Sequence, residues 1–478
     1  MAGPLEPGNR NVVDPSPPVQ ASRTVLDNAL TPVTINRVEI NGAFRTRRSY
    51  LDPVFKPLVD DGPIPTTTTI GDVVDRINVA SEKLASLGVF KEDIRVSIAQ
   101  ALDNPHPTAE SLNLIFNVQE KGLLVLSAGT SVGNTEGSAV THLQLRNILG
   151  GSETLTLDAS TGTRTRAAYQ AALSTPVLNN PALRLSLEGT RSSIHKPWAS
   201  HTENLTSGIL RLALDKTHTL SLSTTHRQIT SLAATASPAV RSEAGDSLKT
   251  SLSHTFTRDR RTGPFPFIPS RGYLIRTISE LAGWGPLQGD VSFAKSEVEL
   301  AAVAPLGPPG VTVGGSFRAG ALLPLPFGYA LSGPTRPSRI SDRFQLGGPT
   351  DVRVFQLGGL GPHDGKDAVG GDVYAAAGVN VMVPLPRVGA ESPLRMQAFV
   401  SAGRLVALRS SRWKGRGGLA GAVEEVVGGG LPSMAAGVGL VYAHPIGRFE
   451  LNFGLPLVVR RGEEGRKGLQ LGVGITFM

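Results

Sequence analysis

The chain has no cysteine, few aromatic residues (5%) and no stretch of about 18 consecutive apolar residues. The missing thiols exclude disulfides, thiolate metal sites and a cysteine nucleophile. The missing apolar run argues against a transmembrane helix, but membrane strands are short and only half apolar, so they escape such a search. The low aromatic content and the dispersed Lys and Arg argue against nucleic-acid binding, in spite of a net charge of +8.

The N-terminal part divides into a tail and a small module. Residues 1–29 are rich in Pro and polar residues and lack the apolar segment of a secretory signal, so we expect a disordered tail. Residues 30–120 form the module. Strand patterns lie at 33–40, 95–101 and 112–118, and helical stripes at 47–59 and after a helix-capping Thr69. This order predicts an α+β domain without a catalytic constellation, suited to offering a strand edge or groove to an extended peptide.

Residues 121–478 repeat a strict two-residue alternation. From Leu469 to Phe477, bulky side chains alternate with Gly and small polar residues. A soluble sandwich shows the same alternation, but here the second face also carries charges such as Glu188 and Glu450, which a wet lumen tolerates. We therefore predict a transmembrane β-barrel of 16 antiparallel strands, with long connections at 325–372 and at 407–432, the first of which the motif resemblance described below implies to fold inward. The predicted strands are 123–132, 139–146, 153–161, 164–173, 182–193, 205–214, 217–230, 247–258, 273–283, 288–302, 311–324, 373–383, 394–406, 433–443, 446–458 and 467–477.

Three short patterns resemble those of a hydrolase nucleophile, a phosphate-binding loop and a metal site, but each lacks the sequence context that such a site needs. Gly129–Gly133 matches G-x-S-x-G, but a turn follows instead of the helix of a nucleophile elbow. Gly365-Lys366 lacks the upstream Gly of a phosphate-binding loop. The nine His are scattered, without a ligand pair on a helix. We predict that the protein is not an enzyme and binds neither a metal nor a cofactor.

The stretch from Asp342 to Phe355 is the most specific in the chain. Its aromatic-x-Leu-Gly-Gly and apolar-Arg-x-Phe patterns resemble the lumenal loop of the outer-membrane β-barrel assembly family, in particular its mitochondrial sorting and assembly branch. The matching residues are Phe344, Leu346, Gly347, Gly348, Val352, Arg353 and Phe355. Val354 stands where the family usually has Gly. Because a β-branched residue does not easily adopt φ > 0, we expect a differently shaped loop tip.

Two further hallmarks extend the resemblance over residues 30–478. One is Thr257–Arg260 followed by Pro269, Gly272 and Tyr273. The other is Phe399–Gly403, where the family often has an acidic or amide partner for the loop Arg, and where this chain has Ser401 and Ala402. We therefore expect Arg353 to pair with an inward carboxylate such as Glu297 or Glu299. The resemblance also identifies the N-terminal module as a single polypeptide-transport-associated (POTRA) domain.

The resemblance implies an insertase of the mitochondrial outer membrane, with its N-terminal domain in the intermembrane space. Its partners would be unfolded β-barrel precursors (porin and the import-channel barrel), accessory subunits of the sorting and assembly machinery, and outer-membrane lipid. The last strand itself matches the sorting signal of mitochondrial barrels at Gln470, Gly472, Ile475 and Phe477. A precursor strand would pair with the first strand at a weak seam, the lateral gate. The expected gate residues are Leu124, Val125, Leu126, Ser127, Ala128, Gly129, Gly472, Ile475 and Phe477.

Two other functions remain open at this stage. One is a protein-translocation channel of the same superfamily, and the other is a passive porin. A porin needs neither the N-terminal module nor the loop motif. A bacterial secretion pore would carry a signal peptide, and a plastid channel several N-terminal modules. The insertase is therefore the preferred interpretation.

Overall fold

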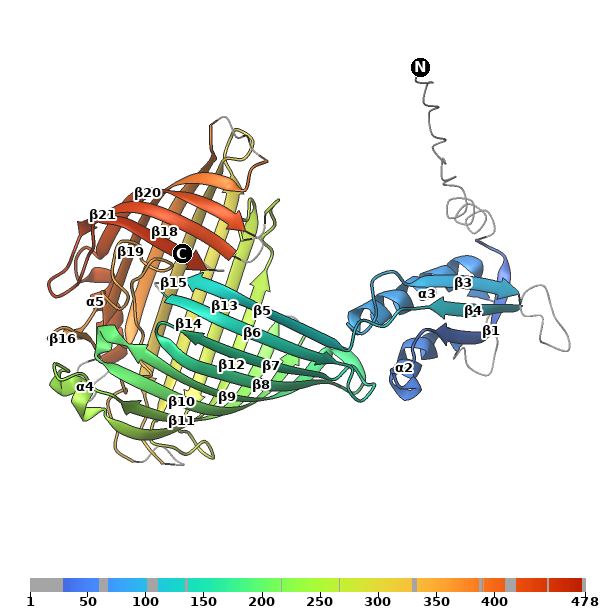
Figure 1. Ribbon diagram of the computed structural model, residues 1–478, viewed down its shortest axis with the longest axis horizontal. Coiled ribbons are helices and arrows are strands. Elements are labelled where there is room, and N and C mark those ends of the chain that lie inside the picture. Colours follow the sequence, from blue (N-terminus) through green and yellow to red (C-terminus); the bar gives the residue numbers. More distant parts are fainter. Residues whose placement is uncertain are drawn as a thin grey trace, which may run out of the picture. The chain divides into compact units, whose positions relative to one another are not determined.

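The structure is a computed structural model that describes residues 29–59, 68–100, 111–133, 136–215, 217–265, 267–328, 333–386, 389, 391–408, 418–444 and 447–474. Except for Ala29, the predicted tail lies outside these residues. The chain divides into two units, residues 1–123 with 146–153 and residues 124–145 with 154–478 (Figure 1). In the described part of the chain, no helix is long and apolar enough to cross a membrane.

The N-terminal unit is the predicted α+β domain. Its elements are β1 (Pro32–Asn41), α2 (Arg48–Val59), β2 (Thr68–Thr69), α3 (Ile70–Ser86), β3 (Arg95–Gln100) and β4 (Ser111–Asn117), with the sheet order β2-β1-β4-β3. Thr69 caps α3 through a capping box with Asp72, and Gly88 follows the helix with φ +72°. The apolar faces of both helices pack on the sheet around Leu84 and Phe116. The short strand β2 was not predicted.

The second unit is a 16-stranded antiparallel sheet whose strands follow one another in chain order, which confirms the predicted barrel. The strands are β5 (Leu124–Gly133), β6 (Glu136–Arg146), β7 (Thr154–Gly162), β8 (Thr165–Val177), β9 (Asn180–Lys196), β10 (His201–Leu214), β11 (His218–Thr230), β12 (Gly245–Asp259), β13 (Gly272–Ala282), β14 (Phe293–Pro305), β15 (Thr312–Pro324), β18 (Val373–Pro384), β19 (Leu394–Val406), β20 (Ser433–His444), β21 (Gly447–Val458) and β22 (Gly468–Gly474). The predicted start of β14 at residue 288 is too early. Asp290 instead bonds to Leu248 of β12, its N–H donating to the Leu248 carbonyl at 2.8 Å and its carboxylate accepting from the Leu248 N–H at 2.7 Å.

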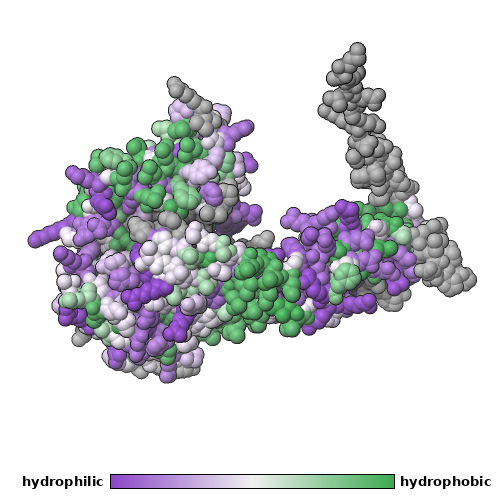
Figure 2. Space-filling model, in the orientation of Figure 1, coloured by the Kyte–Doolittle hydropathy of each residue, from purple (hydrophilic) through white to green (hydrophobic). Residues whose placement is uncertain are grey.

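The outer face of the barrel is apolar and the inner face polar. On β21 the outward Leu451, Phe453 and Leu455 are 45–49% exposed, whereas the alternating Glu450 and Asn452 are buried. Figure 2 shows hydrophobic residues gathered over β20 and β21. A sheet with this alternation buries its polar residues in the lumen and presents its apolar face to lipid.

Short elements lie in the connections between strands. They are the 3-10 helix η1 (Pro197–Ala199), α4 (Pro238–Ser242), the hairpin of β16 (His363–Asp364) and β17 (Asp367–Ala368), and α5 (Gly418–Gly428). The long segment between β15 and β18, here called the lumenal loop (residues 325–372), packs its apolar residues against inward residues of the barrel such as Phe293, Leu322 and Phe399. This packing brings the loop motif to the last strands of the barrel.

Candidate functional site

The sheet is open between its first and last strands. Cα atoms of β5 and β22 approach within 8 Å. In the described residues, however, β5 pairs only with β6, and β22 only with β21. Each strand therefore has an edge of backbone donors and acceptors that no other described strand uses. We call the boundary between β5 and β22 the seam.

The structure places most of the expected gate residues at the seam. Leu124 and Leu126 on β5 are 56% and 65% exposed. Val125 is half-buried, and Ser127, Ala128 and Gly129 are exposed. Gly472 lies on β22 and is buried. Ile475 and Phe477 lie outside the described residues.

The apolar residues of the loop motif form one buried cluster with the barrel. Phe344, Leu346, Val352 and Phe355 are at most 7% exposed. Glycines on the strands make room for them. A Cβ on Gly403 of β19 would lie 2.8 Å from Val352 Cγ2, and a Cβ on Gly320 of β15 would lie 2.7 Å from Phe344 Cζ. The lumenal wall is therefore shaped to receive this loop.

The Leu-Gly-Gly segment of the motif turns the loop. Gly347 has φ +107° and Gly348 has φ +129°, a region that favours Gly. A Cβ on Gly347 would also lie 2.5 Å from the carbonyl oxygen of Gln356. The Asp351 carboxylate accepts a hydrogen bond from the Gly347 N–H at 2.9 Å and pairs with Arg318 at 2.9 Å. Both glycines are thus required by the backbone of the turn.

Arg353 is buried and pairs with Glu450 of β21. Its Nε and Nη2 donate to the two carboxylate oxygens of Glu450 at 3.0 and 3.2 Å, and the two side chains are 1% and 0% exposed. Gln397 and Asn452 donate to the same carboxylate at 3.1 and 2.8 Å, and Arg448 pairs with it. A buried carboxylate is tolerated when several donors and cations satisfy it in this way.

The expected pairing of Arg353 with Glu297 or Glu299 is therefore wrong. Glu297 accepts a hydrogen bond from Tyr374 and lies 4.0 Å from Arg318, and Glu299 lies 3.8 Å from Arg276. The partner comes from β21, whose lumenal face the loop reaches only after folding inward. Glu450, Asn452, Gln397 and Arg448 are site residues that sequence reasoning missed. The alternation had placed Glu450 and Asn452 on the inward face, which was the available signal.

Val354 adopts φ +74°, so the expectation that a β-branched residue would avoid this backbone conformation is also wrong. Its side chain is 2% exposed, and a Cβ on Gly454 of β21 would lie 2.2 Å from Val354 Cγ2. The loop residue is large, and the strand residue facing it has no side chain. Burial of the Val354 side chain offsets the backbone strain, which is typically about 1–3 kcal/mol.

The last strand, β22, and the segment before it are hydrogen-bonded to the backbone of the lumenal loop. The Val354 N–H donates to Gln470 Oε1 at 2.9 Å, and Gln470 Nε2 donates to the Phe355 carbonyl at 3.4 Å. The Arg466 N–H donates to the Val354 carbonyl at 2.7 Å. Gln470 is thus a residue of the expected sorting signal that the loop contacts directly.

The other family hallmarks divide between the site and a separate turn. Phe399 lies under the Arg353 guanidinium, 5.1 Å from its centre, and Ser401 is buried on the same strand. Thr257–Arg260 ends β12 instead. The Arg260 N–H donates to the Tyr273 carbonyl at 2.8 Å, and Gly272 has φ +105°. The second hallmark therefore shapes the β12–β13 connection.

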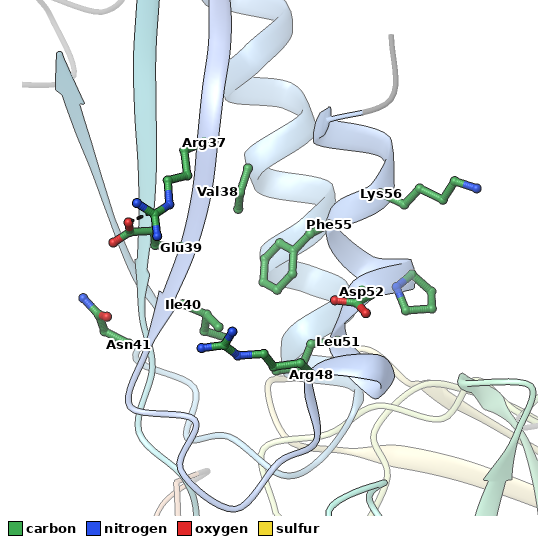
Figure 3. A pocket seen from close by; sticks show the side chains of 11 residues that line it. Arg37, Val38, Glu39, Ile40, Asn41, Arg48, Leu51, Asp52, Phe55 and Lys56 are labelled. Carbon is green, nitrogen blue, oxygen red and sulfur yellow. Dashed lines mark ion pairs between the residues drawn. The ribbon is translucent and has the colours of Figure 1, made fainter. Parts of the chain in front are cut away.

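The N-terminal unit carries a groove beside β1 (Figure 3). In the described residues, the ladder between β1 and β2 covers Pro32 and Val33, and β4 pairs with the other edge of β1. The groove has a volume of about 730 Å³ and lies between β1 and α2. Val38, Ile40 and Phe55 line its apolar part, and the Arg37–Glu39 ion pair (3.0 Å) lies on the other face of β1.

The described residues include no group of three or more His, Asp or Glu side chains placed to hold a metal ion. The geometry instead combines strand edges, a groove and a buried loop. Strand edges and grooves are features through which proteins commonly bind extended polypeptides.

Comparisons with known proteins give the family. A model of the Omp85 superfamily domain matches residues 147–477. The chain is 37% identical to a SAM50-like protein of Schizosaccharomyces pombe, over 96% of this chain and 93% of that protein. It is 32% identical to the sorting and assembly machinery component 50 homolog of Homo sapiens, over 96% and 93% of the two chains.

Similarity to a solved structure agrees with this at the level of fold. BamA from Haemophilus ducreyi lacking POTRA domains 1–3 superposes with a TM-score of 0.69 at 16% identity, over 92% of this chain and 85% of that one. The sequence relatives span nearly the whole chain. The chain belongs to the Omp85 superfamily and, within it, to the family of sorting and assembly machinery component 50.

Proposed function

We propose that this protein folds β-barrel precursors and inserts them into the mitochondrial outer membrane. The precursor's last strand would take the place of β22 and pair with β5 at the seam. The name of the human relative supports a role in a sorting and assembly machinery. The resemblance of the loop motif to the mitochondrial branch of the family supports the mitochondrial outer membrane as the location. The activity consists of strand exchange and requires no bond chemistry.

One observation carries the proposed mechanism: β5 and β22 are close but share no ladder in the described residues. In a closed barrel each backbone group pairs with a neighbouring strand, and an unpaired group in hydrocarbon costs several kcal/mol. A seam with two free edges can accept a strand at little cost, because few existing hydrogen bonds need to break. Further precursor strands would then add as hairpins, so that few of their backbone groups meet lipid unpaired.

The filled lumen argues against a passive porin. The loop residues Arg353 and Phe355 are 1% and 0% exposed and lie against the inward faces of β19, β20 and β21. A wide aqueous path through this part of the barrel would require the whole loop to leave its packed position. A translocation channel of the same superfamily is the remaining alternative.

We assign the N-terminal unit as the POTRA domain, located in the intermembrane space. The groove between β1 and α2, lined by Phe55, suits an extended segment of a precursor or of an accessory subunit. Main-chain hydrogen bonds would supply affinity without sequence specificity, as binding of different precursors requires. Outer-membrane lipid would contact the apolar outer face of the barrel.

Cysteine cross-linking tests the proposed function, since the chain has no native Cys. Single cysteines at positions 124–129 on β5 would be combined with a porin precursor that carries a cysteine in its last strand. Disulfides along β5 that disappear when the precursor's sorting signal is mutated would support strand pairing at the seam. Cross-links confined to lumenal positions such as 474, with β5 unreactive, would instead indicate a translocation channel.

A further inference from the structure

A cavity of about 770 Å³ lies beside the last strand of the barrel. Residues from both faces of β22 line it, namely Gln470 of the inner face and Leu469, Leu471 and Val473 of the outer face. β21 covers one edge of β22, and no other described strand pairs with the opposite edge. The cavity therefore passes this unpaired edge and reaches from the lumenal loop to the lipid-facing side of the sheet.

The polar end of the cavity carries an excess of positive charge. Among the described residues that line it, three are permanent cations, Arg164, Lys366 and Arg466, and one is a carboxylate, Glu464. Lys366 and Arg466 are exposed, and within the described part of the chain neither has a carboxylate within 4.0 Å. An anion that entered the cavity would meet two cations whose charge is not already balanced by an ion pair.

The third cation is part of the cavity wall. The Arg164 guanidinium lies over the Trp198 ring, 5.5 Å from the ring centre, and pairs with Glu136 at 3.8 Å. A Cβ on Gly358 of the lumenal loop would lie 2.8 Å from Trp198 Cδ1, so the indole packs directly on the loop backbone. Since Glu136 balances Arg164, the excess charge comes from Lys366 and Arg466.

The basic end and the apolar residues lie at different depths of the barrel. Arg164, Trp198 and Arg466 belong to the connections that follow β7, β9 and β21, the third, fifth and fifteenth strands of the sheet. In an antiparallel sheet these connections share one rim. From that rim, the outer residues from Leu469 to Val473 extend about 13 Å along β22. Rims of a membrane barrel lie at the level of lipid headgroups, and strands at the level of hydrocarbon.

We infer that this cavity binds an anionic phospholipid. The phosphate lies at Lys366 and Arg466, and an acyl chain follows the outer residues of β22. A soluble phosphate would use only the basic end, and a zwitterionic headgroup brings a cation of its own to that end. The outer face of β22 meets the bilayer, so lipid is always available at the cavity. Lipid binding here does not require strand exchange.

Trp198 reports on the cavity by fluorescence, because it lines the cavity and the chain has three Trp in all. In the full-length chain with Trp284→Phe and Trp413→Phe, Trp198 is the sole emitter. This protein is reconstituted in phosphatidylcholine vesicles with increasing fractions of chain-brominated phosphatidylglycerol. Chain-brominated phosphatidylcholine is the zwitterionic reference. Because bromine quenches Trp fluorescence at short range, the fraction at half-maximal quenching measures the relative affinity of the cavity for each lipid.

We expect half-maximal quenching at a several-fold lower fraction of phosphatidylglycerol than of phosphatidylcholine. A Lys or Arg beside an anionic lipid raises its binding about fivefold, so Lys366→Gln combined with Arg466→Gln should remove the preference. The control, with the same loss of charge, is Arg258→Gln combined with Arg461→Gln, two exposed residues that do not line the cavity. Equal quenching by both lipids in the starting protein, or equal effects of the two double variants, would overturn the lipid site.

A second variant tests the acyl chain. Leu471→Ser should weaken quenching by phosphatidylglycerol several-fold, whereas Leu222→Ser, an outward residue of β11 that is 42% exposed, should leave it unchanged. The heat-dependent gel mobility of a folded barrel verifies that each variant is folded. Equal quenching in these two variants would contradict the binding of a lipid chain along β22. Loss of the phosphatidylglycerol preference in inorganic phosphate, at constant ionic strength, would assign the basic end to a soluble anion and overturn the inference.

Discussion

Arg353 and Glu450 are 97 residues apart in the chain, yet their side chains form a bidentate ion pair inside the barrel with N–O distances of 3.0 and 3.2 Å. The pair joins the lumenal loop to β21, the strand beside the seam. Since both groups are buried, neither can exchange its partner for water. The loop is therefore part of the folded barrel, and its position is coupled to the last two strands.

Replacement of Glu450 should strongly destabilise the barrel. Glu450→Ala leaves the buried cations of Arg353 and Arg448 without their carboxylate, and we expect a loss of about 3–5 kcal/mol of unfolding free energy. Denaturant unfolding in detergent or lipid would measure this loss. Glu299→Ala is the matched control, because Glu299 is a half-buried carboxylate 3.8 Å from Arg276 and should change stability by less than about 1 kcal/mol. Equal effects of the two substitutions would contradict the assigned role of Glu450.

A methyl group at Gly454 should displace the loop. Gly454→Ala puts a Cβ 2.2 Å from Val354 Cγ2, and overpacking of this kind costs about 1–3 kcal/mol. Val354→Ala in the same chain should recover part of that loss, which a double-mutant cycle would detect as a coupling energy. Gly189→Ala on β9 meets no atom within 4 Å and serves as the control. Additive effects of the Gly454 and Val354 substitutions would show that the two residues do not share one space.

A charge on the outer face should be costly at mid-strand. Leu451→Lys on β21 places an ammonium where the side chain is exposed to lipid, and we expect about 2–4 kcal/mol of destabilisation in a bilayer. The comparison is Gln170→Lys on β8, since Gln170 alternates with the outward Tyr169 and therefore faces the lumen. If both substitutions were equally tolerated in lipid vesicles, the outward face of β21 would not be the membrane face.

The N-terminal unit should lose a local contact at low pH. Burial raises the pKa of Glu120, but hydrogen bonds from Thr46 and Arg45 outweigh burial, so the pKa of this carboxyl lies below its ordinary range. A lowered pKa means that the carboxylate stabilises the fold above the pKa of the unfolded chain. This stabilisation is lost as the pH falls through the lower folded-state pKa.

Amide hydrogen exchange at Arg45 and Thr46, whose N–H groups both donate to Glu120 at 3.0 Å, would follow this loss. After correction for intrinsic rates, protection at these two amides should fall between neutral pH and about pH 4 or below. Glu120→Gln should remove this pH dependence. Protection that fell equally in wild type and in Glu120→Gln would assign the change to another group.

The barrel was largely predictable because a strand alternates its side chains between two faces, and the pattern depends only on local sequence. Glu450 was correctly placed on the inner face, and its neighbours Leu451 and Phe453 lie on the outer face at odd positions of the same alternation. The motif from Phe344 to Phe355 likewise identified the loop. The start of β14 was misplaced because Val291 and Phe293 alternate with polar neighbours as a strand does, whereas the hydrogen bonds of Asp290 go to Leu248 of β12, a contact that hydropathy does not encode.

The sequence by itself determined the number of strands and the face of each strand that meets lipid, since both depend on residues near one another in the chain, and the resemblance of the loop motif indicated which loop enters the lumen. Only the tertiary structure decided that Arg353 pairs with Glu450, that Val354 adopts a positive φ against Gly454, and that Gln470 contacts the loop backbone. These contacts join segments about 100 residues apart. In the linear sequence, several inward carboxylates are equally plausible partners for Arg353, and several glycines are equally plausible neighbours of Val354. Only the closed barrel, with the loop packed inside it, decides which of these residues lie close enough for contact.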